Sequence, residues 1–108
     1  MSATFNRIDT FDRLDEVFAA SHERPVIIFK HSNSCGISAD LQYQLGSVNG
    51  EINIVVVQES RALSDAVAER TGFRHQSPQV FVIENGKPVY QASHYAIDPR
   101  AIEKHISK

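Results

Sequence analysis

The sequence predicts a single α/β domain over residues 1–108, with a mixed central sheet of four to five strands and flanking helices. Apolar runs rich in β-branched residues alternate along the chain with amphipathic helical patterns, as in βαβ units. The pair Asn85-Gly86 separates the last two strand-like runs, which predicts an antiparallel hairpin with a two-residue turn. Parallel and antiparallel strands are therefore expected in one sheet.

Composition limits the function classes. A chain of 108 residues with 42% hydrophobic and 22% charged side chains can bury one core without disulfides. The net charge of -2 and the lack of a basic block argue against binding to nucleic acid or to a membrane surface. The apolar runs are too short to span a bilayer, and the first residues lack a signal peptide's apolar segment. A single cysteine fits a reducing compartment, so we expect a cytoplasmic protein.

The first half of the chain predicts three strands and two helices. The residue before a proline disfavours helical geometry, so the first helix should stop before Pro25. The unbroken run after Pro25 has no polar alternation, which indicates a strand buried on both faces. The expected elements are a strand Phe5 to Ile8, a helix capped by Asp9 or Thr10, a strand Val26 to Phe29, a helix Cys35 to Leu45 ended by Gly46, and a strand Ile52 to Val57.

The second half predicts a helix, a hairpin and a final helix. Asp98-Pro99 has the pattern of an N-cap followed by proline at the first helical position. The expected elements are a helix from Ser60 to Gly72, a connection Phe73 to Gln79, a strand Val80 to Ile83, a strand with Val89, Tyr90 and Ala92, His94 and Tyr95 at its end, and a helix after Asp98.

Cys35 is the strongest candidate for chemistry. It lies where the central strand has ended and a helix begins, and the unpaired N-H groups and dipole of a helix N-terminus favour a thiolate. Ser38 follows one turn later and can offer its hydroxyl to the sulfur. Ser38 cannot resolve a disulfide, so any disulfide of Cys35 must be formed with another molecule.

The neighbours of Cys35 are assigned supporting roles. Asn33 and Ser34 are candidate caps of the helix. His31 and His75 can tune the thiolate or approach a substrate carboxylate. The spacing of cysteine and histidines matches no zinc pattern, so we predict no metal site. Three cations are interpreted as surface charges: Lys30, Arg61 and Arg74.

Ser77-Pro78 supplies the second half of the candidate site. The predicted order β-α-β-α-β-α-β-β-α, with Cys35 after the second strand and an Xaa-Pro before the fourth, is similar to the thioredoxin fold. In that fold Pro78 would lie opposite Cys35 with a cis peptide bond, and the backbone of Ser77 would be free to pair with an extended thiol substrate. The alternative is an ordinary trans proline at the start of a strand.

Three motifs resemble those of the monothiol bacilliredoxins: Lys30-His31-Ser32, Cys35-x-Ile37-Ser38 and His75-Gln76-Ser77-Pro78-Gln79. The resemblance implies a thioredoxin fold and an oxidoreductase whose Cys35 removes bacillithiol from mixed disulfides on oxidised client proteins. It implies a low-molecular-weight thiol as co-substrate and no bound cofactor. The family's usual motif is Thr-Cys-Pro-Ile-Ser, whereas this chain has Ser34 and Gly36 at the threonine and proline positions. Glycine restores an N-H and loosens the first turn of the helix.

The motifs leave two alternatives open. Cys-Gly-Ile-Ser also resembles the Cys-Gly-Phe-Ser of monothiol glutaredoxins, which use glutathione and hold iron-sulfur clusters. Their Gly-Gly-x-Asp segment is missing, since the corresponding region reads Glu84-Asn85-Gly86-Lys87. The second alternative is a non-enzymatic adaptor in which Cys35 is a regulatory thiol.

Overall fold

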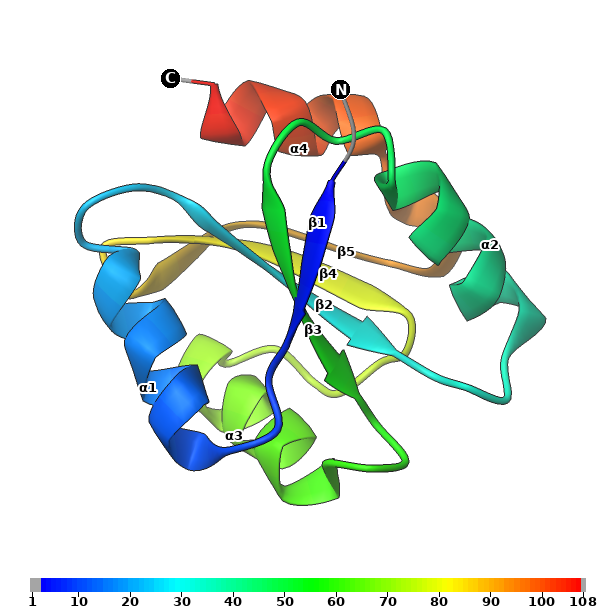
Figure 1. Cartoon of the computed structure of the whole chain (residues 1–108), viewed down its shortest axis with the longest axis horizontal. Coiled ribbons are helices and arrows are strands. Elements are labelled where there is room, and N and C mark those ends of the chain that lie inside the picture. The colour runs from blue at the N-terminus through cyan, green and yellow to red at the C-terminus, as the bar shows by residue number, and fades with distance from the viewer. Residues whose placement is uncertain (1–2, 108) are drawn as a thin grey trace.

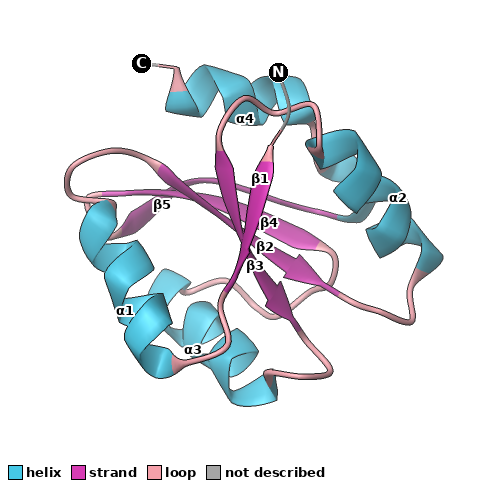
Figure 2. Ribbon diagram, in the orientation of Figure 1, coloured by secondary structure: helices cyan, strands magenta, loops and turns pink. Residues whose placement is uncertain are grey.

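The computed structural model describes residues 3–107, whose strands form one sheet in the order β1-β3-β2-β4-β5. β1, β3 and β2 run parallel to one another, and β4 and β5 continue the sheet antiparallel (Figure 2). This mixed sheet of five strands confirms the predicted fold class. The strands are β1 (Thr4–Arg7), β2 (Val26–His31), β3 (Glu51–Val56), β4 (Gln79–Glu84) and β5 (Lys87–Ser93).

The helices cover both faces of the sheet. α1 and α3 lie on one face, and α2 and α4 lie on the other (Figure 1). The helices are α1 (Phe11–Ala20), α2 (Gly36–Leu45), α3 (Arg61–Thr71) and α4 (Pro99–Ile106), with a short 3-10 turn η1 (His94–Ala96). Within residues 3–107, no helix has the length and apolar composition needed to cross a membrane.

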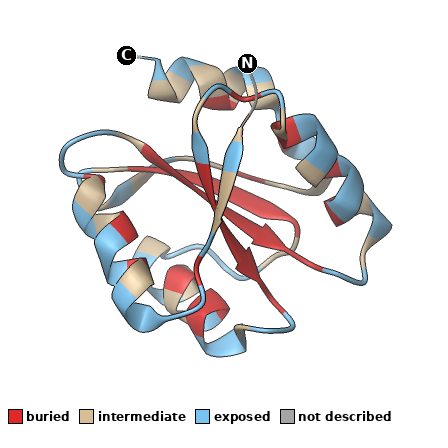
Figure 3. Ribbon diagram, in the orientation of Figure 1, coloured by how far each residue is buried: buried red, intermediate tan, exposed pale blue. Residues whose placement is uncertain are grey.

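The core divides into two apolar clusters, one on each face of the sheet. Figure 3 shows that burial concentrates in the central strands between the helices. Every residue of β2 is buried, as its unbroken apolar run predicts. Ile27 and Phe29 pack on the α2 and α4 side, whereas Val26 and Ile28 pack on the α1 and α3 side. Side chains of β2 thus alternate between the two clusters.

Local signals set most of the element boundaries. Thr10 accepts a hydrogen bond from the Arg13 backbone N-H at the start of α1, and Asp98 caps α4 in the same way. Gly72 ends α3 with a φ of 77°. Asn85 and Gly86 have φ angles of 54° and 76°, which suits the tight β4–β5 turn.

Two predicted boundaries are wrong by more than one residue. β2 continues past Phe29, because the polar residues Lys30 and His31 still pair with Val55 and Val56 of β3. His94 and Tyr95 do not end the last strand but form η1, since His94 adopts a φ of 53° and leaves the ladder.

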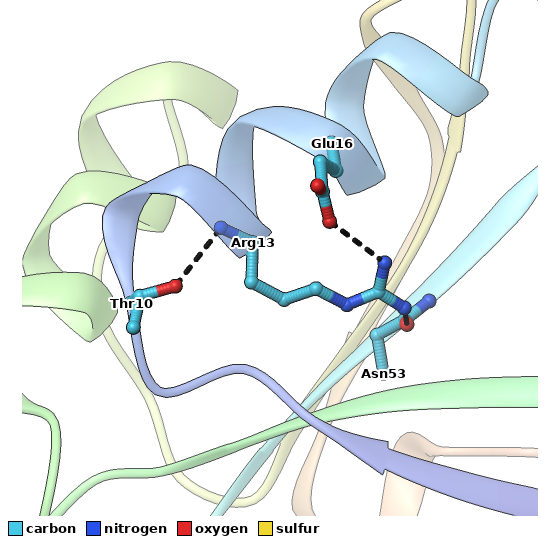
Figure 4. A network of polar contacts seen from close by, with 4 residues as sticks. All are labelled: Thr10, Arg13, Glu16 and Asn53. Atoms are coloured by element: carbon cyan, nitrogen blue, oxygen red, sulfur yellow. Dashed lines mark hydrogen bonds and ion pairs between the residues drawn. The ribbon is translucent and has the colours of Figure 1, made fainter.

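A polar contact crosses the α1 side of the sheet. Arg13 donates hydrogen bonds of 3.3 Å to the Glu16 carboxylate and 3.3 Å to the Asn53 amide oxygen, as Figure 4 shows. Asn53 is buried in β3 and donates from its amide nitrogen to the Ile27 carbonyl oxygen at 3.0 Å. The buried amide is therefore satisfied on both sides.

Candidate functional site

Cys35 is a half-buried free thiol at the N-terminus of α2. It is the N-cap residue of that helix, in an extended conformation, and its side chain makes no capping hydrogen bond. Its carbonyl oxygen accepts the Ala39 N-H at 3.1 Å, which starts the helical ladder. Cys35 therefore directly precedes the first-turn N-H groups of α2, which have no partner within the helix.

Asn33 and Ser34 do not cap α2, so their predicted role is wrong. Cys35 itself occupies the N-cap position, and both residues precede it on an exposed loop. The Asn33 amide nitrogen contacts the Glu59 carboxylate at 3.5 Å, and Ser34 Oγ contacts Ser32 Oγ at 3.4 Å. These side chains bind the neighbouring loop in place of the helix amides.

Gln58 holds the loop before Cys35. Its amide nitrogen donates to Ser32 Oγ at 2.7 Å and to Ser34 Oγ at 3.0 Å, and its amide oxygen accepts the Asn33 N-H at 3.0 Å. Gln58 is not among the residues predicted from the sequence. Its signal is a polar amide two residues after β3, whose carboxyl end meets that of parallel β2 at one edge of the sheet.

Ser38 and His31 form a buried pair between α2 and β2. Ser38 Oγ lies 2.7 Å from His31 Nδ1 and accepts the Ser32 N-H at 3.0 Å. Among the hydrogen bonds of residues 3–107, none joins Ser38 to the Cys35 sulfur, contrary to the expected contact. The reason is that Ser38 is fully buried on the inner side of α2, whereas Cys35 is partly exposed.

Burial lowers the pKa of His31 below 6.5, and the positive charge of Arg7 lowers it further. The ring is therefore neutral near neutral pH, and it cannot supply a positive charge to the Cys35 thiolate there. The role that the geometry gives His31 is to anchor α2 through Ser38.

Ser77-Pro78 lies at the same edge of the sheet as Cys35. The Ser77-Pro78 peptide bond is cis. In the β2–β4 pairing Lys30 lies opposite Gln79, so the chain reaches Pro78 where β2 approaches its carboxyl end. The His94 N-H donates to the Pro78 carbonyl oxygen at 3.0 Å, which links this segment to η1.

Lys30 is not a surface charge, contrary to the sequence interpretation. Its side chain is fully buried on the α3 side of the sheet, with Nζ 5.9 Å from the centre of the Phe81 ring. Nζ also lies 3.2 Å from His75 Nδ1, and Ser64 Oγ lies 3.1 Å from the same nitrogen. Lys30 therefore connects the end of β2 to the loop that leads to Pro78.

Electrostatics at this pair follow from burial. Burial lowers the pKa of Lys30 from 10.5 to about 8, with Asp65 acting in the opposite direction. Burial also lowers the pKa of His75. The positive charges of Lys30 and Arg61 lower it further, whereas the negative charge of Asp65 raises it. Near pH 7 the arrangement is thus an ammonium beside a neutral imidazole.

Gln79 fixes the loop on the other side of His75. Gln79 is 1% exposed, and its amide oxygen accepts the Gln76 N-H at 3.2 Å. Its amide nitrogen donates to the Arg74 carbonyl oxygen at 3.2 Å and to the Gln91 amide oxygen at 2.8 Å. The residues that lead to Ser77 are therefore held by buried polar side chains from β2 and β4.

One recess on the described surface has a lining that does not include Cys35. It has a volume of about 940 Å³ and lies between α2 and the start of α4, with Tyr43, Gln44 and Arg100 in its lining. Within residues 3–107, no group of three His, Cys, Asp or Glu side chains is arranged to hold a metal ion. The chemistry that this arrangement offers is that of a partly exposed thiol at the same edge of the sheet as a loop that holds a proline.

A protein-family model described as monothiol bacilliredoxin BrxC matches residues 6–102. The match includes Cys35, Ser77 and Pro78 and covers most of the chain.

Solved structures share the fold. One, provisionally described as an oxidoreductase with a thioredoxin fold, is 28% identical with a TM-score of 0.84, over 94% of this chain and 92% of that chain. A thioredoxin of Malassezia sympodialis is 17% identical with a TM-score of 0.73, over 96% and 89%. Thioredoxin NaTrxh of Nicotiana alata is 12% identical with a TM-score of 0.74, over 99% and 93%. The fold is therefore thioredoxin-like.

Proposed function

Because this chain belongs to the monothiol bacilliredoxin family, we propose that it removes bacillithiol from mixed disulfides on oxidised client proteins through Cys35. The observation that carries the proposal is the half-buried free thiol at the N-terminus of α2, in a chain with no second cysteine. A thiol in this position attacks a disulfide as its thiolate. The membership itself supports thiol-disulfide oxidoreductase chemistry in general.

The proposed reaction has two steps. The Cys35 thiolate attacks the bacillithiol sulfur of the mixed disulfide, a new disulfide forms between Cys35 and bacillithiol, and the client sulfur leaves as a thiolate. A second thiol molecule or a separate reductase then attacks the disulfide on Cys35 and restores the Cys35 thiolate. Since Ser38 cannot perform this second step, turnover depends on the concentration of external thiol.

The surrounding residues act on the position of the sulfur and of the substrate. In the proposal the backbone of Ser77, next to the cis Pro78, pairs with an extended segment of the client protein. Ser38 and His31 hold α2 on the sheet, and Ser34 holds the loop before Cys35. We also propose a cytoplasmic location, because a lone reactive thiol suits a reducing compartment.

A comparison of two mixed disulfides tests the small thiol. A neutral peptide with one cysteine is prepared as the bacillithiol and as the glutathione mixed disulfide, and transfer to Cys35 is followed by intact mass. We expect faster transfer of bacillithiol. Faster transfer of glutathione would point to the glutaredoxin-like alternative, whose characteristic segment is replaced here by the turn of the β4–β5 hairpin.

The variant Cys35→Ser tests the chemistry. It should form no mixed disulfide and release no client thiol, because serine is not a nucleophile towards disulfides under these conditions. Full turnover by this variant would rule out the mechanism. Wild-type protein that reacts with both mixed disulfides no faster than a free cysteine would favour the adaptor with a regulatory thiol.

A further inference from the structure

The two edges of the His75 ring have different environments. The side chain of His75 is exposed, yet its Nδ1 edge is turned towards the buried Lys30 ammonium and the Ser64 hydroxyl, at 3.2 Å and 3.1 Å. His75 lies in the loop between α3 and β4, two residues before Ser77. The other ring nitrogen, Nε2, is therefore the polar atom that His75 offers to a bound substrate.

Lys30 determines which ring nitrogen holds the proton. An ammonium group has three donors and no acceptor, so the contact requires Nδ1 to accept. Lys30 is protonated at neutral pH, since its pKa is about 8. A neutral imidazole that accepts at Nδ1 must hold its proton at Nε2. His75 thus presents an N-H donor in one fixed tautomer.

The charges around His75 favour an anionic acceptor. Lys30 and Arg61 are both near enough to lower the pKa of the ring, and Arg74 is its neighbour in the chain. Asp65 is the acidic group that opposes them. An N-H donor in a locally positive field binds a carboxylate better than a neutral acceptor of the same shape.

We propose that His75, oriented by Lys30, forms a carboxylate-binding subsite beside the Ser77-Pro78 segment. Lys30 is a positioning residue in this subsite, because it acts through His75. The subsite rests on the proposed disulfide exchange at Cys35 and names one chemical group of its substrate. The carboxylate can come from the small thiol or from the client protein next to its oxidised cysteine.

Two pairs of probes distinguish these sources. In the first, a neutral single-cysteine peptide carries 3-mercaptopropionate or its neutral isostere 3-mercaptopropionamide in disulfide linkage. In the second pair, both peptides carry 3-mercaptopropionamide, and the residue next to the peptide cysteine is Asp in one peptide and Asn in the other. We expect the carboxylate member of at least one pair to transfer to Cys35 roughly fivefold faster, and the preference to disappear in His75→Ala and to survive partly in His75→Gln.

A spectroscopic measurement separates positioning from structural damage. The ¹⁵N shifts of the His75 ring should show protonation at Nε2 in the wild type and a mixture of tautomers in Lys30→Met, whose carboxylate preference should also fall. His22→Ala is the matched control, since His22 is also exposed but lies near Gly86, at the turn between β4 and β5.

The outcomes separate the two proposals. Equal rates for both members of both pairs, or a preference unchanged in His75→Ala, would overturn the subsite and leave exchange at Cys35 standing. Protonation at Nδ1 in the wild type would overturn the positioning role of Lys30. Absence of transfer to Cys35 from every one of these probes and from the bacillithiol mixed disulfide would refute the proposed function itself.

Discussion

The two last residues of β2 hold the two halves of the candidate site in different ways. His31 points to the α2 side, where a neutral ring contacts Ser38 at the start of the helix that holds Cys35. Lys30 points to the α3 side, where an ammonium contacts His75 in the loop that leads to Pro78. Because successive side chains of a strand point to opposite faces, two adjacent residues reach both halves.

The two contacts differ in the desolvation free energy that each requires. Ser38 Oγ satisfies two buried partners, His31 Nδ1 and the Ser32 N-H, without burying a charge. Lys30 instead keeps an ammonium out of water, with His75 Nδ1 as its one side-chain acceptor within residues 3–107, and its lowered pKa reflects the cost of that desolvation. We infer that the His31 side contributes to stability, whereas the Lys30 side is maintained for the position of His75.

The largest expected effect is that of Ser38→Ala. Loss of the Ser38 hydroxyl leaves His31 Nδ1 and the Ser32 N-H buried without a partner. The substitution should therefore lower the free energy of unfolding by about 2 to 4 kcal/mol. Urea unfolding measures this. The matched control is Ser47→Ala, since Ser47 is exposed and donates to the Gln44 carbonyl oxygen, and it should change stability by less than about 0.5 kcal/mol. Equal effects of the two would show that the His31 side is not stabilising.

The fold could be predicted from the sequence because its signals are local. Pro25, Gly72 and the pair Asn85-Gly86 each fix a boundary through their own backbone preferences. The length of β2 could not be predicted in this way, because pairing with β3 carries the strand through Lys30 and His31 against their polarity. Such pairing is a property of the assembled sheet.

The second prediction is that the Lys30 and His31 contacts affect the free energy of unfolding in different pH ranges. Between about pH 8 and 10.5 the unfolded chain binds a proton at Lys30 that the folded chain has released, so stability should rise with pH relative to Lys30→Met. Stability should also rise with pH because of His31, but at lower pH. Relative to His31→Asn, the contribution of His31 to stability is complete above pH 6.5 and is lost as the pH falls below that value.

Urea unfolding across this pH range checks both windows. At pH 7 Lys30→Met should be at least as stable as the wild type, because methionine fills the same space without a desolvated charge. The comparison between the two sides would break down if Lys30→Met lost stability at pH 7, or if the difference between it and the wild type were constant from pH 8 to 10.5.

Residues of the candidate site could be proposed from the sequence only where their chemistry distinguishes them. Cys35 is the single thiol of the chain, and Ser77-Pro78 is recognisable from the order of elements. Gln58 and Gln79 have no such mark, since an amide becomes a positioning group only when folding brings loop backbone within its reach. The burial of Lys30 was missed for the same reason, because a lysine at a strand end is usually exposed.

The third prediction concerns the loop before Cys35, which Gln58 holds. Gln58→Ala removes the contacts to Ser32, Asn33 and Ser34, so transfer to Cys35 should slow by up to about tenfold because the thiol is held less closely. Stability should fall by only about 1 kcal/mol, because Gln58 is exposed. Gln44→Ala, which removes an exposed amide bound to Asp40, is the control and should leave the rate unchanged. A Gln58→Ala rate equal to that of the control would exclude the positioning role.

The smallest expected effect is at Gly36, where this chain departs from the family's usual proline. Gly36 is the first residue of α2, a Cβ added there would meet no atom within 4 Å, and Cys35 has φ and ψ of -115° and 117°, which a following proline accepts. Both Gly36→Ala and Gly36→Pro should therefore stabilise the fold by about 0.5 to 1 kcal/mol, chiefly by restricting the unfolded chain.

The two variants differ in one group, since proline removes the N-H that alanine keeps. If that N-H helps to hold the Cys35 thiolate, transfer should be slower in Gly36→Pro than in Gly36→Ala by at most about fivefold, measured by intact mass at matched pH. Equal rates would mean that the remaining amides of the first turn and the position of α2, fixed through Ser38, are sufficient.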